Sequence, residues 1–127
     1  MNNLKFRVWD KTNKEMLNID VLNLFLEEVV VLEDDGSAFS MKFKDVEFMQ
    51  STGLFDKDGK EIFEGDILTD EGSFENDCWD YATIEFDETD YTYYLHWKNE
   101  EVYENITECK KYVVAGNIFE NKDLLEE

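Results

Sequence analysis

The stretch Asp56-Lys57-Asp58-Gly59-Lys60-Glu61-Ile62-Phe63-Glu64-Gly65-Asp66-Ile67-Leu68 decides the fold class of this chain. It holds two glycine turns, one on each side of a short apolar strand over Lys60–Phe63, and a further strand begins at Asp66. Glycine adopts positive φ without the steric cost that a side chain brings, so it suits tight turns between strands. This spacing is typical of a small β-barrel. The stretch carries neither a nucleophile paired with a general base nor a set of metal ligands.

Alternating apolar and polar residues predict further strands on both sides of this stretch. Val21–Leu32 is ambiguous, because its apolar residues suit either a strand or a short helix followed by a strand. Asp34-Asp35-Gly36 predicts a turn, and Asn121 is expected to cap a short helix through Asp123–Leu125. The predicted strands are Leu4–Asp10 and Glu15–Asp20 as a hairpin, Ser37–Phe43, Val46–Gln50, Lys60–Phe63, Asp66–Thr69, Tyr81–Phe86 and Tyr91–Trp97 as a second hairpin, Val102–Ile106 and Tyr112–Phe119.

The expected architecture follows from eight to ten short strands with no helix of crossover length between them. Successive strands without such a helix pair in antiparallel fashion. We therefore predict a mainly β fold: an SH3-like, partly open antiparallel β-barrel with additional strands and a short C-terminal helical turn. The chain has 127 residues, 43% of them hydrophobic, and no linker, so residues 1–127 are predicted to form a single domain.

The net charge of −20 limits the classes of partner. Such a charge repels phosphate backbones and anionic lipid surfaces, so we expect neither direct nucleic-acid binding nor membrane binding. The start of the chain does not resemble a signal peptide, and no CxxC pair is present. Reduced thiols in a bacterial cytoplasm fit this composition better than a disulfide. The sequence leaves open whether Cys78 and Cys109 lie close together.

No residue pattern predicts a cofactor or a metal ion. A calcium loop with Gly59 at its sixth position would place Leu54 and Gly65 at the first and twelfth, where neither side chain can be a ligand. His96 is the only histidine and lacks a local zinc or nucleophile motif, so a surface or interface position is expected for it. Carboxylate pairs such as Glu85 with Asp87 arise by chance among thirty-two acids.

Four glycines and one aromatic stretch stand out for structural roles. The glycines are too widely spaced for a phosphate-binding loop, and their expected task is positive φ or close backbone approach. Acidic residues surround the aromatic stretch, which therefore suits a packed strand face or a protein interface better than nucleic-acid stacking. The glycines are Gly53, Gly59, Gly65 and Gly116, and the candidate interface residues are Tyr91, Tyr93 and Trp97.

Three blocks in order resemble the YopX family of phage and prophage proteins. They are Lys5–Asp10 followed by Lys14-Glu15-Met16, then Met49–Leu54 running into Asp56–Leu68, and finally Val114–Asn121 followed by Leu124-Leu125. Family members often have a proline after the last asparagine, where this chain has Lys122. The resemblance implies an SH3-like β-barrel and a phage or prophage origin. It supplies no catalytic residues.

The leading hypothesis for function is a non-enzymatic phage or prophage accessory protein that binds another protein, whose identity the sequence does not reveal. Exposed strand edges and aromatic residues also make a homo-oligomer plausible. Two alternatives stay open. One is an acidic DNA mimic that inhibits a DNA-binding protein, and the other is a metal-dependent enzyme that uses surface carboxylates.

Overall fold

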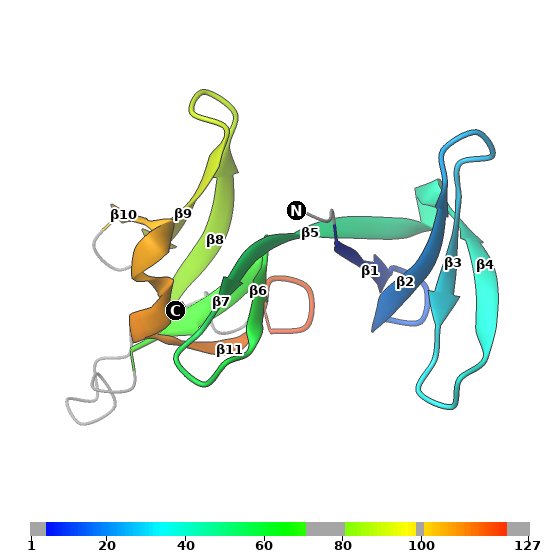
Figure 1. Ribbon diagram of the computed structural model, residues 1–127, viewed down its shortest axis with the longest axis horizontal. Helices are drawn as coiled ribbons and strands as arrows, with labels where there is room; N and C mark the ends of the chain where they lie inside the picture. The colour runs from blue at the N-terminus through cyan, green and yellow to red at the C-terminus, as the bar shows by residue number, and fades with distance from the viewer. Residues whose placement is uncertain (1–4, 71–80, 99–100, 122–127) are drawn as a thin grey trace. The chain divides into compact units, whose positions relative to one another are not determined.

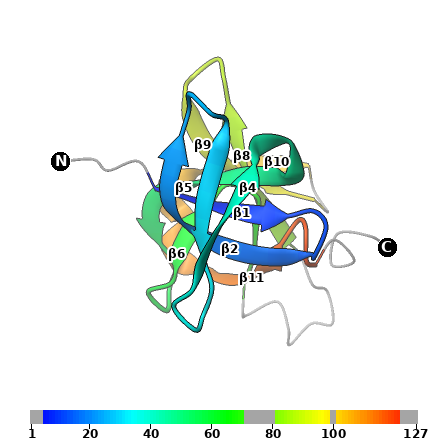
Figure 2. The same ribbon diagram turned by 90° about the vertical axis from the view of Figure 1, so that its right-hand side faces the viewer.

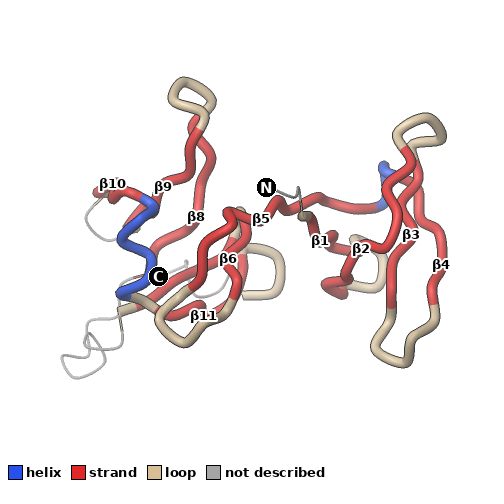
Figure 3. The backbone as a smooth tube through the Cα atoms, viewed as in Figure 1, coloured by secondary structure: helices blue, strands red, loops and turns tan. Residues whose placement is uncertain are grey.

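The computed structural model describes residues 5–70, 81–98 and 101–121. They form a mainly β protein in which every strand pair of the described part is antiparallel (Figure 1, Figure 3), as the sequence predicts. The chain divides into two compact units, Met1–Gln50 and Ser51–Glu127. Cooperative folding of residues 1–127 as a single domain stays a prediction.

The first unit is an antiparallel meander (Figure 2), in which the chain order of the strands is nearly their order in the sheet. The sheet order is β4-β3-β2-β1-β5, so the start of β5 pairs with β1 and lies opposite the β4 edge. The elements are β1 (Phe6–Asp10), β2 (Glu15–Asn23), β3 (Glu28–Leu32), β4 (Ala38–Lys42), the 3₁₀ turn η1 (Phe43–Asp45) and β5 (Val46–Phe55), which continues past Gln50 into the second unit.

A buried aspartate closes the predicted hairpin between β1 and β2. Asp10 is 1% exposed, and its Oδ1 accepts hydrogen bonds from the backbone N–H groups of Thr12 and Asn13 at 3.0 and 3.2 Å. Apolar residues of four strands then form the core of this unit, since alternate side chains of a strand point to one face. The core residues are Val8, Leu17, Val29, Val31 and Val46.

The segment that was ambiguous in the sequence is a strand pair, and the helical alternative for it is wrong. β2 extends to Asn23 and pairs with β3, with a register shift between Ile19 and Val21. The β-branched residues of β3 favour extended backbone, and two of them reach the core. A helix over this segment would lose these cross-strand contacts.

The second unit contains a five-stranded antiparallel sheet in the order β10-β9-β8-β7-β11. In the described residues β10 and β11 are its two edges, so this sheet does not close into a barrel. The end of β5 pairs with β6 beside it. The elements are β6 (Glu61–Phe63), β7 (Asp66–Thr69), β8 (Tyr81–Asp87), β9 (Thr92–Trp97), β10 (Val102–Asn105), the 3₁₀ helix η3 (Ile106–Lys111) and β11 (Val113–Asn117).

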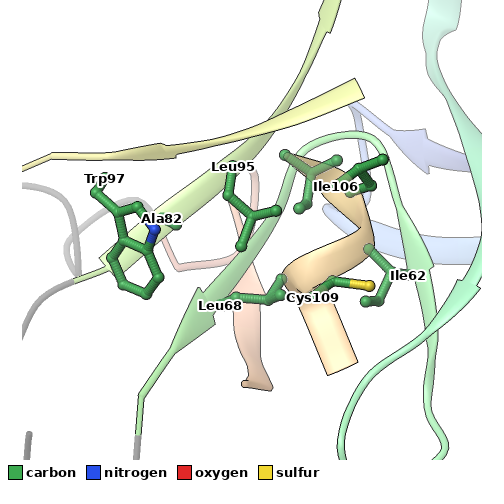
Figure 4. Close-up of a cluster of buried hydrophobic side chains, with 8 residues drawn as sticks. Ile62, Leu68, Ala82, Leu95, Trp97, Ile106 and Cys109 are labelled. Carbon is green, nitrogen blue, oxygen red and sulfur yellow. The ribbon is translucent and has the colours of Figure 1, made fainter. Parts of the chain in front are cut away.

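The core of the second unit lies between this sheet and η3 (Figure 4). Ile106 and Cys109 extend from η3 toward apolar side chains of the strands. The sequence did not predict η3, and the described residues contain eleven strands where eight to ten were expected. The predicted terminal helix at Asp123–Leu125 lies outside the described residues. The buried cluster comprises Ile62, Leu68, Ala82, Ile84, Leu95, Trp97, Ile106 and Cys109.

Asp56 is the local organiser of the stretch that decides the fold. It is 6% exposed, and its Oδ1 accepts hydrogen bonds from the backbone N–H of Asp58 at 2.9 Å and of Lys60 at 2.8 Å. Its Oδ2 accepts a third, from the N–H of Val114 on β11, at 2.9 Å. One carboxylate therefore shapes the turn and attaches it to a strand that lies far away in the sequence.

The glycines of the predicted turns have the backbone angles that such turns require. Gly59 has φ of +86° and Gly65 has φ of +88°, and Gly53 has φ of +80° within β5. Gly116 has a different role, because a Cβ built on it would lie 2.3 Å from Oδ1 of Asn121. That oxygen accepts the backbone N–H of Asn117, so close approach at Gly116 allows the end of β11 to form.

Candidate functional site

His96 is the centre of a polar cluster formed by residues of β8, β9 and β10 and by Glu101, which precedes β10. His96 is 9% exposed, so the surface alternative for it is wrong, and an interface position stays a prediction. Its Nδ1 lies 2.8 Å from Oε2 of Glu85, and its Nε2 lies 2.8 Å from Oε2 of Glu101. The ring stacks on Tyr103 with centroids 4.3 Å apart and an interplanar angle of 11°. These contacts join three successive strands through one side chain.

Strand pairing places these groups together. His96 lies opposite Thr83 of β8 and opposite Tyr103 of β10 in the register of the sheet. Glu85 is two residues along β8 from Thr83, which makes it a diagonal neighbour of His96 within reach of a long side chain. Thr83 Oγ1 also donates a hydrogen bond of 2.7 Å to Glu85 Oε2, which orients the carboxylate.

The cluster favours the charged form of its histidine. Burial lowers the pKa of His96, but the hydrogen bonds to Glu101 and Glu85 outweigh it and leave the pKa above its ordinary value. For Glu85, burial raises the pKa, whereas hydrogen bonds from Thr83 and His96 bring it below its ordinary value. Lys98 lies 3.4 Å from the same Glu85 oxygen. When protonated, the ring is an imidazolium between two carboxylates and over an aromatic ring, a favourable cation–π geometry.

This arrangement suits a structural clamp better than an acid–base catalyst. A general base needs a ring nitrogen within hydrogen-bond reach of a substrate proton. Both nitrogens of His96 instead face carboxylates of the protein itself. Glu85 and Glu101 lie on opposite sides of the ring, so their oxygens do not converge with it on one point. Among the described residues, no group of three or more His, Cys, Asp or Glu could hold a metal ion.

The thiol of Cys109 lies apart from this cluster, in the core of the second unit. It is 2% exposed, and its Sγ lies 3.7 Å from the backbone oxygen of Phe55. Burial raises the pKa of this thiol above its ordinary value, which disfavours the thiolate that nucleophilic chemistry needs. Cys78 lies outside the described residues, so its distance from Cys109 stays an open question.

A second candidate site lies in the first unit, at the tip of the β2–β3 hairpin. We call Leu24, Phe25 and Leu26 the apolar tip; these residues are 72%, 93% and 53% exposed. Val21 and Leu22, which precede the tip on β2, are 50% and 38% exposed. Single exposed apolar residues are ordinary on protein surfaces, but a contiguous apolar patch marks an interaction site. The sequence does not predict this patch, because the apolar spacing of the segment also suits the buried face of a helix.

The turn that carries the apolar tip is built by its neighbours. Oδ1 of Asn23 accepts a hydrogen bond of 3.0 Å from the backbone N–H of Leu26. Glu27, which immediately precedes β3, adopts φ of +54°. Its backbone oxygen accepts a hydrogen bond from the backbone N–H of Phe43. These hydrogen bonds of the turn thus come from the Asn23 side chain and from backbone groups.

The three candidate interface residues have different environments. Tyr91 is 81% exposed in the β8–β9 turn, with φ of +54°. Tyr93 is half-buried and packs edge-on against Phe86 at 5.1 Å. Trp97 is 9% exposed within the core, where its Nε1 donates a hydrogen bond of 2.9 Å to Glu104. Tyr91 is thus the most accessible of the three, and an interface role for the set stays a prediction.

Comparison with known proteins gives a family and a structural neighbour. The chain is similar to the protein in the crystal structure of protein EF1440 from Enterococcus faecalis, with 29% sequence identity and a TM-score of 0.69. The alignment covers 99% of this chain and 100% of that one. None of the curated proteins matches significantly. Within the described residues, no helix has the length and apolar character needed to cross a membrane. The model of the family described as YopX protein matches residues 5–126, so the chain belongs to the YopX family.

Proposed function

We propose that this protein is a non-enzymatic protein-binding module that contacts its partner through the apolar tip. The observation that carries the proposal is the 93% exposure of Phe25 between two exposed leucines. A hairpin turn normally carries small polar residues, because they satisfy its backbone and face water. An apolar tip on a polar turn framework costs solubility without improving the fold. Burial against a partner accounts for it.

The free energy gained by burying the apolar tip is enough to anchor a protein partner. Full burial of a leucine or phenylalanine side chain contributes about 1.5–3 kcal/mol. Three such side chains form a compact anchor of the kind that dominates protein interfaces, although ordering and lost mobility offset part of the gain. The net charge of −20 opposes insertion of the same tip into an anionic membrane.

Two features of the polar residues support a role in binding over catalysis. Both ring nitrogens of His96 face internal carboxylates, and the thiol of Cys109 is buried. Several acids of the chain also have internal tasks, such as the backbone bonds of Asp10 and Asp56. Carboxylates that are engaged inside the protein are not part of a surface row of charges. This gives less support to DNA mimicry, which needs carboxylates spaced like phosphates.

Family membership supports a proposal about origin and architecture as well. We place the protein among phage or prophage accessory proteins that act in the cytoplasm of a bacterial host. We further propose that the second unit is an SH3-like, partly open barrel. The support is its set of short antiparallel strands, with the 3₁₀ helix η3 leading into the last of them.

Quantitative affinity purification from a bacterial lysate tests the binding proposal. The wild-type chain is compared with Phe25→Ser, which removes the centre of the apolar tip, and with Tyr91→Asn. Tyr91→Asn is the matched control, because it removes another exposed aromatic ring and because asparagine tolerates positive φ. Neither change touches a core residue, so both variants should unfold within about 0.5 kcal/mol of wild type.

We expect a defined set of proteins that wild type and Tyr91→Asn retain and Phe25→Ser loses. The partner is then purified, and its dissociation constant for the three chains is measured directly. Equal capture by all three chains would contradict a role for the apolar tip. Loss with Tyr91→Asn alone would transfer the interface to the β8–β9 turn.

A further inference from the structure

The second unit carries an open pocket of about 450 Å³ beside the His96 cluster, formed by residues of β8, β9 and β10 and of the turn that follows β8. Its size lies within the range of about 300–1,000 Å³ that is usual for small-ligand sites. Aromatic residues and carboxylates line the pocket. Its lining comprises the aromatic residues Phe86, Tyr94 and Tyr103 and the carboxylates Glu85, Asp87 and Glu88.

The negative charges of two carboxylates that line the pocket have no positively charged partner among the described residues. Glu85 shares its charge with His96 and Lys98. In the described part of the chain, neither Asp87 nor Glu88 forms an ion pair, although Asp87 Oδ1 accepts a hydrogen bond of 2.7 Å from the N–H of Thr89. Carboxylates beside aromatic walls lose part of their hydration without gaining a counter-charge. A cationic ligand would supply that counter-charge.

The aromatic walls decide which kind of cation fits. Tyr103 is 60% exposed and has one face against His96. Tyr94 lies opposite Glu85 on the same face of the sheet, and its hydroxyl donates a hydrogen bond of 2.8 Å to Asp90. Phe86 pairs with Tyr93, and its ring packs against Tyr93 on the other face, so the aromatic walls are the rings of Tyr94 and Tyr103. Aromatic rings offer no ligand oxygens to a metal ion and cannot replace its water shell. A weakly hydrated, flat cation instead stacks on such rings while it hydrogen-bonds carboxylates at its edge.

We propose that this pocket receives the guanidinium group of an arginine side chain on a protein partner. The group lies flat against the aromatic walls and donates hydrogen bonds to Asp87 and Glu88, a pairing that forked N–H donors and carboxylates favour. The assignment rests on the proposed protein-binding function only in naming a protein as the source of the arginine. It involves different residues from the apolar tip, so the two proposals fail separately.

The test is an NMR titration of the ¹⁵N-labelled chain with two short peptides, one with a single central arginine among neutral residues and one with citrulline in its place. Citrulline keeps the shape of arginine and removes its charge. Free arginine is a third ligand. Two double variants are compared with wild type: Asp87→Asn with Glu88→Gln, and Glu33→Gln with Asp34→Asn. The second pair removes the same charge from exposed positions in the first unit.

The arginine peptide should shift the amides of residues 85–88, 94 and 103, and the citrulline peptide should not. We expect Asp87→Asn with Glu88→Gln to weaken binding about tenfold, and Glu33→Gln with Asp34→Asn to weaken it no more than about twofold. Equal weakening by both pairs would show general attraction to an acidic protein and overturn the site. Equal binding of citrulline would exclude a guanidinium. Free arginine binding as tightly as the peptide would assign the pocket to a small molecule instead of a partner protein.

Discussion

Replacement of Asp56 by alanine should destabilise the second unit strongly. The change removes a 6%-exposed carboxylate and leaves three backbone N–H groups without their acceptor, those of Asp58, Lys60 and Val114. Loss of an acceptor costs about 1–3 kcal/mol for each buried donor, and less where water can enter. The turn donors lie near water and the Val114 donor is half-buried, so the expected total is about 4 kcal/mol.

Urea unfolding followed by circular dichroism and by tryptophan fluorescence measures this free energy. The matched control is Asp58→Ala, which removes the same charge from the same turn at an exposed side chain and should change stability by no more than about 0.5 kcal/mol. Asp56→Asn should fall between the two, because its amide oxygen can still accept from the turn while its NH₂ cannot accept from Val114.

A cost below about 1 kcal/mol for Asp56→Ala, or a cost equal to that of Asp58→Ala, would refute the role of Asp56 as organiser of the stretch. The same curves test the single-domain prediction. A single transition whose midpoint shifts to lower urea concentration in Asp56→Ala indicates that residues 1–127 unfold together. Two transitions, of which only one moves, indicate that the two units unfold separately.

Three further predictions concern the turns, the pH dependence and assembly. Gly65→Val, at φ of +88°, should cost about 1–3 kcal/mol, and an unchanged melting temperature would show that this turn tolerates side chains. The pKa of His96 is raised in the folded protein, so its stabilising contribution relative to His96→Gln is present below about pH 6.5 and is lost as pH rises through the folded pKa. An equal difference in unfolding free energy between wild type and His96→Gln at about pH 5.5 and at about pH 9 would contradict the clamp. Self-association should strengthen with salt, because −20 of charge per copy opposes it, and light scattering that reports a monomer at low and high salt would reject it.

Local features of this chain could be predicted from the sequence because their causes are local. A glycine after an acid determines a turn wherever the neighbouring residues favour strands, as at Gly36, Gly59 and Gly65. The β1–β2 and β8–β9 hairpins follow from alternation over a few residues, and the structure has both. The importance of Asp56 was hidden, because one of its three bonds reaches Val114 on another strand.

The features that the sequence did not predict depend on pairing across the sheet. His96 is buried because Tyr103 lies opposite it and Glu101 reaches its Nε2, and neither contact follows from a motif. The contact between Glu85 and His96 could have been predicted from the hairpin around Asp87–Asp90. In the register of that hairpin, Glu85 is a diagonal neighbour of His96. The boundary between the two units lies within β5, where no change in composition marks it. The apolar tip was hidden by a spacing that also suits a helix.

Site-specific photo-crosslinking in bacterial cells is the most direct test of the central claim that the apolar tip binds a protein. A photoreactive phenylalanine analogue replaces Phe25 in one chain and Tyr91 in another, since both side chains are highly exposed and only one belongs to the tip. The proposal predicts a discrete adduct with one partner protein from position 25 and none of that adduct from position 91. Absence of any adduct from position 25, or the same adducts from both positions, would contradict it.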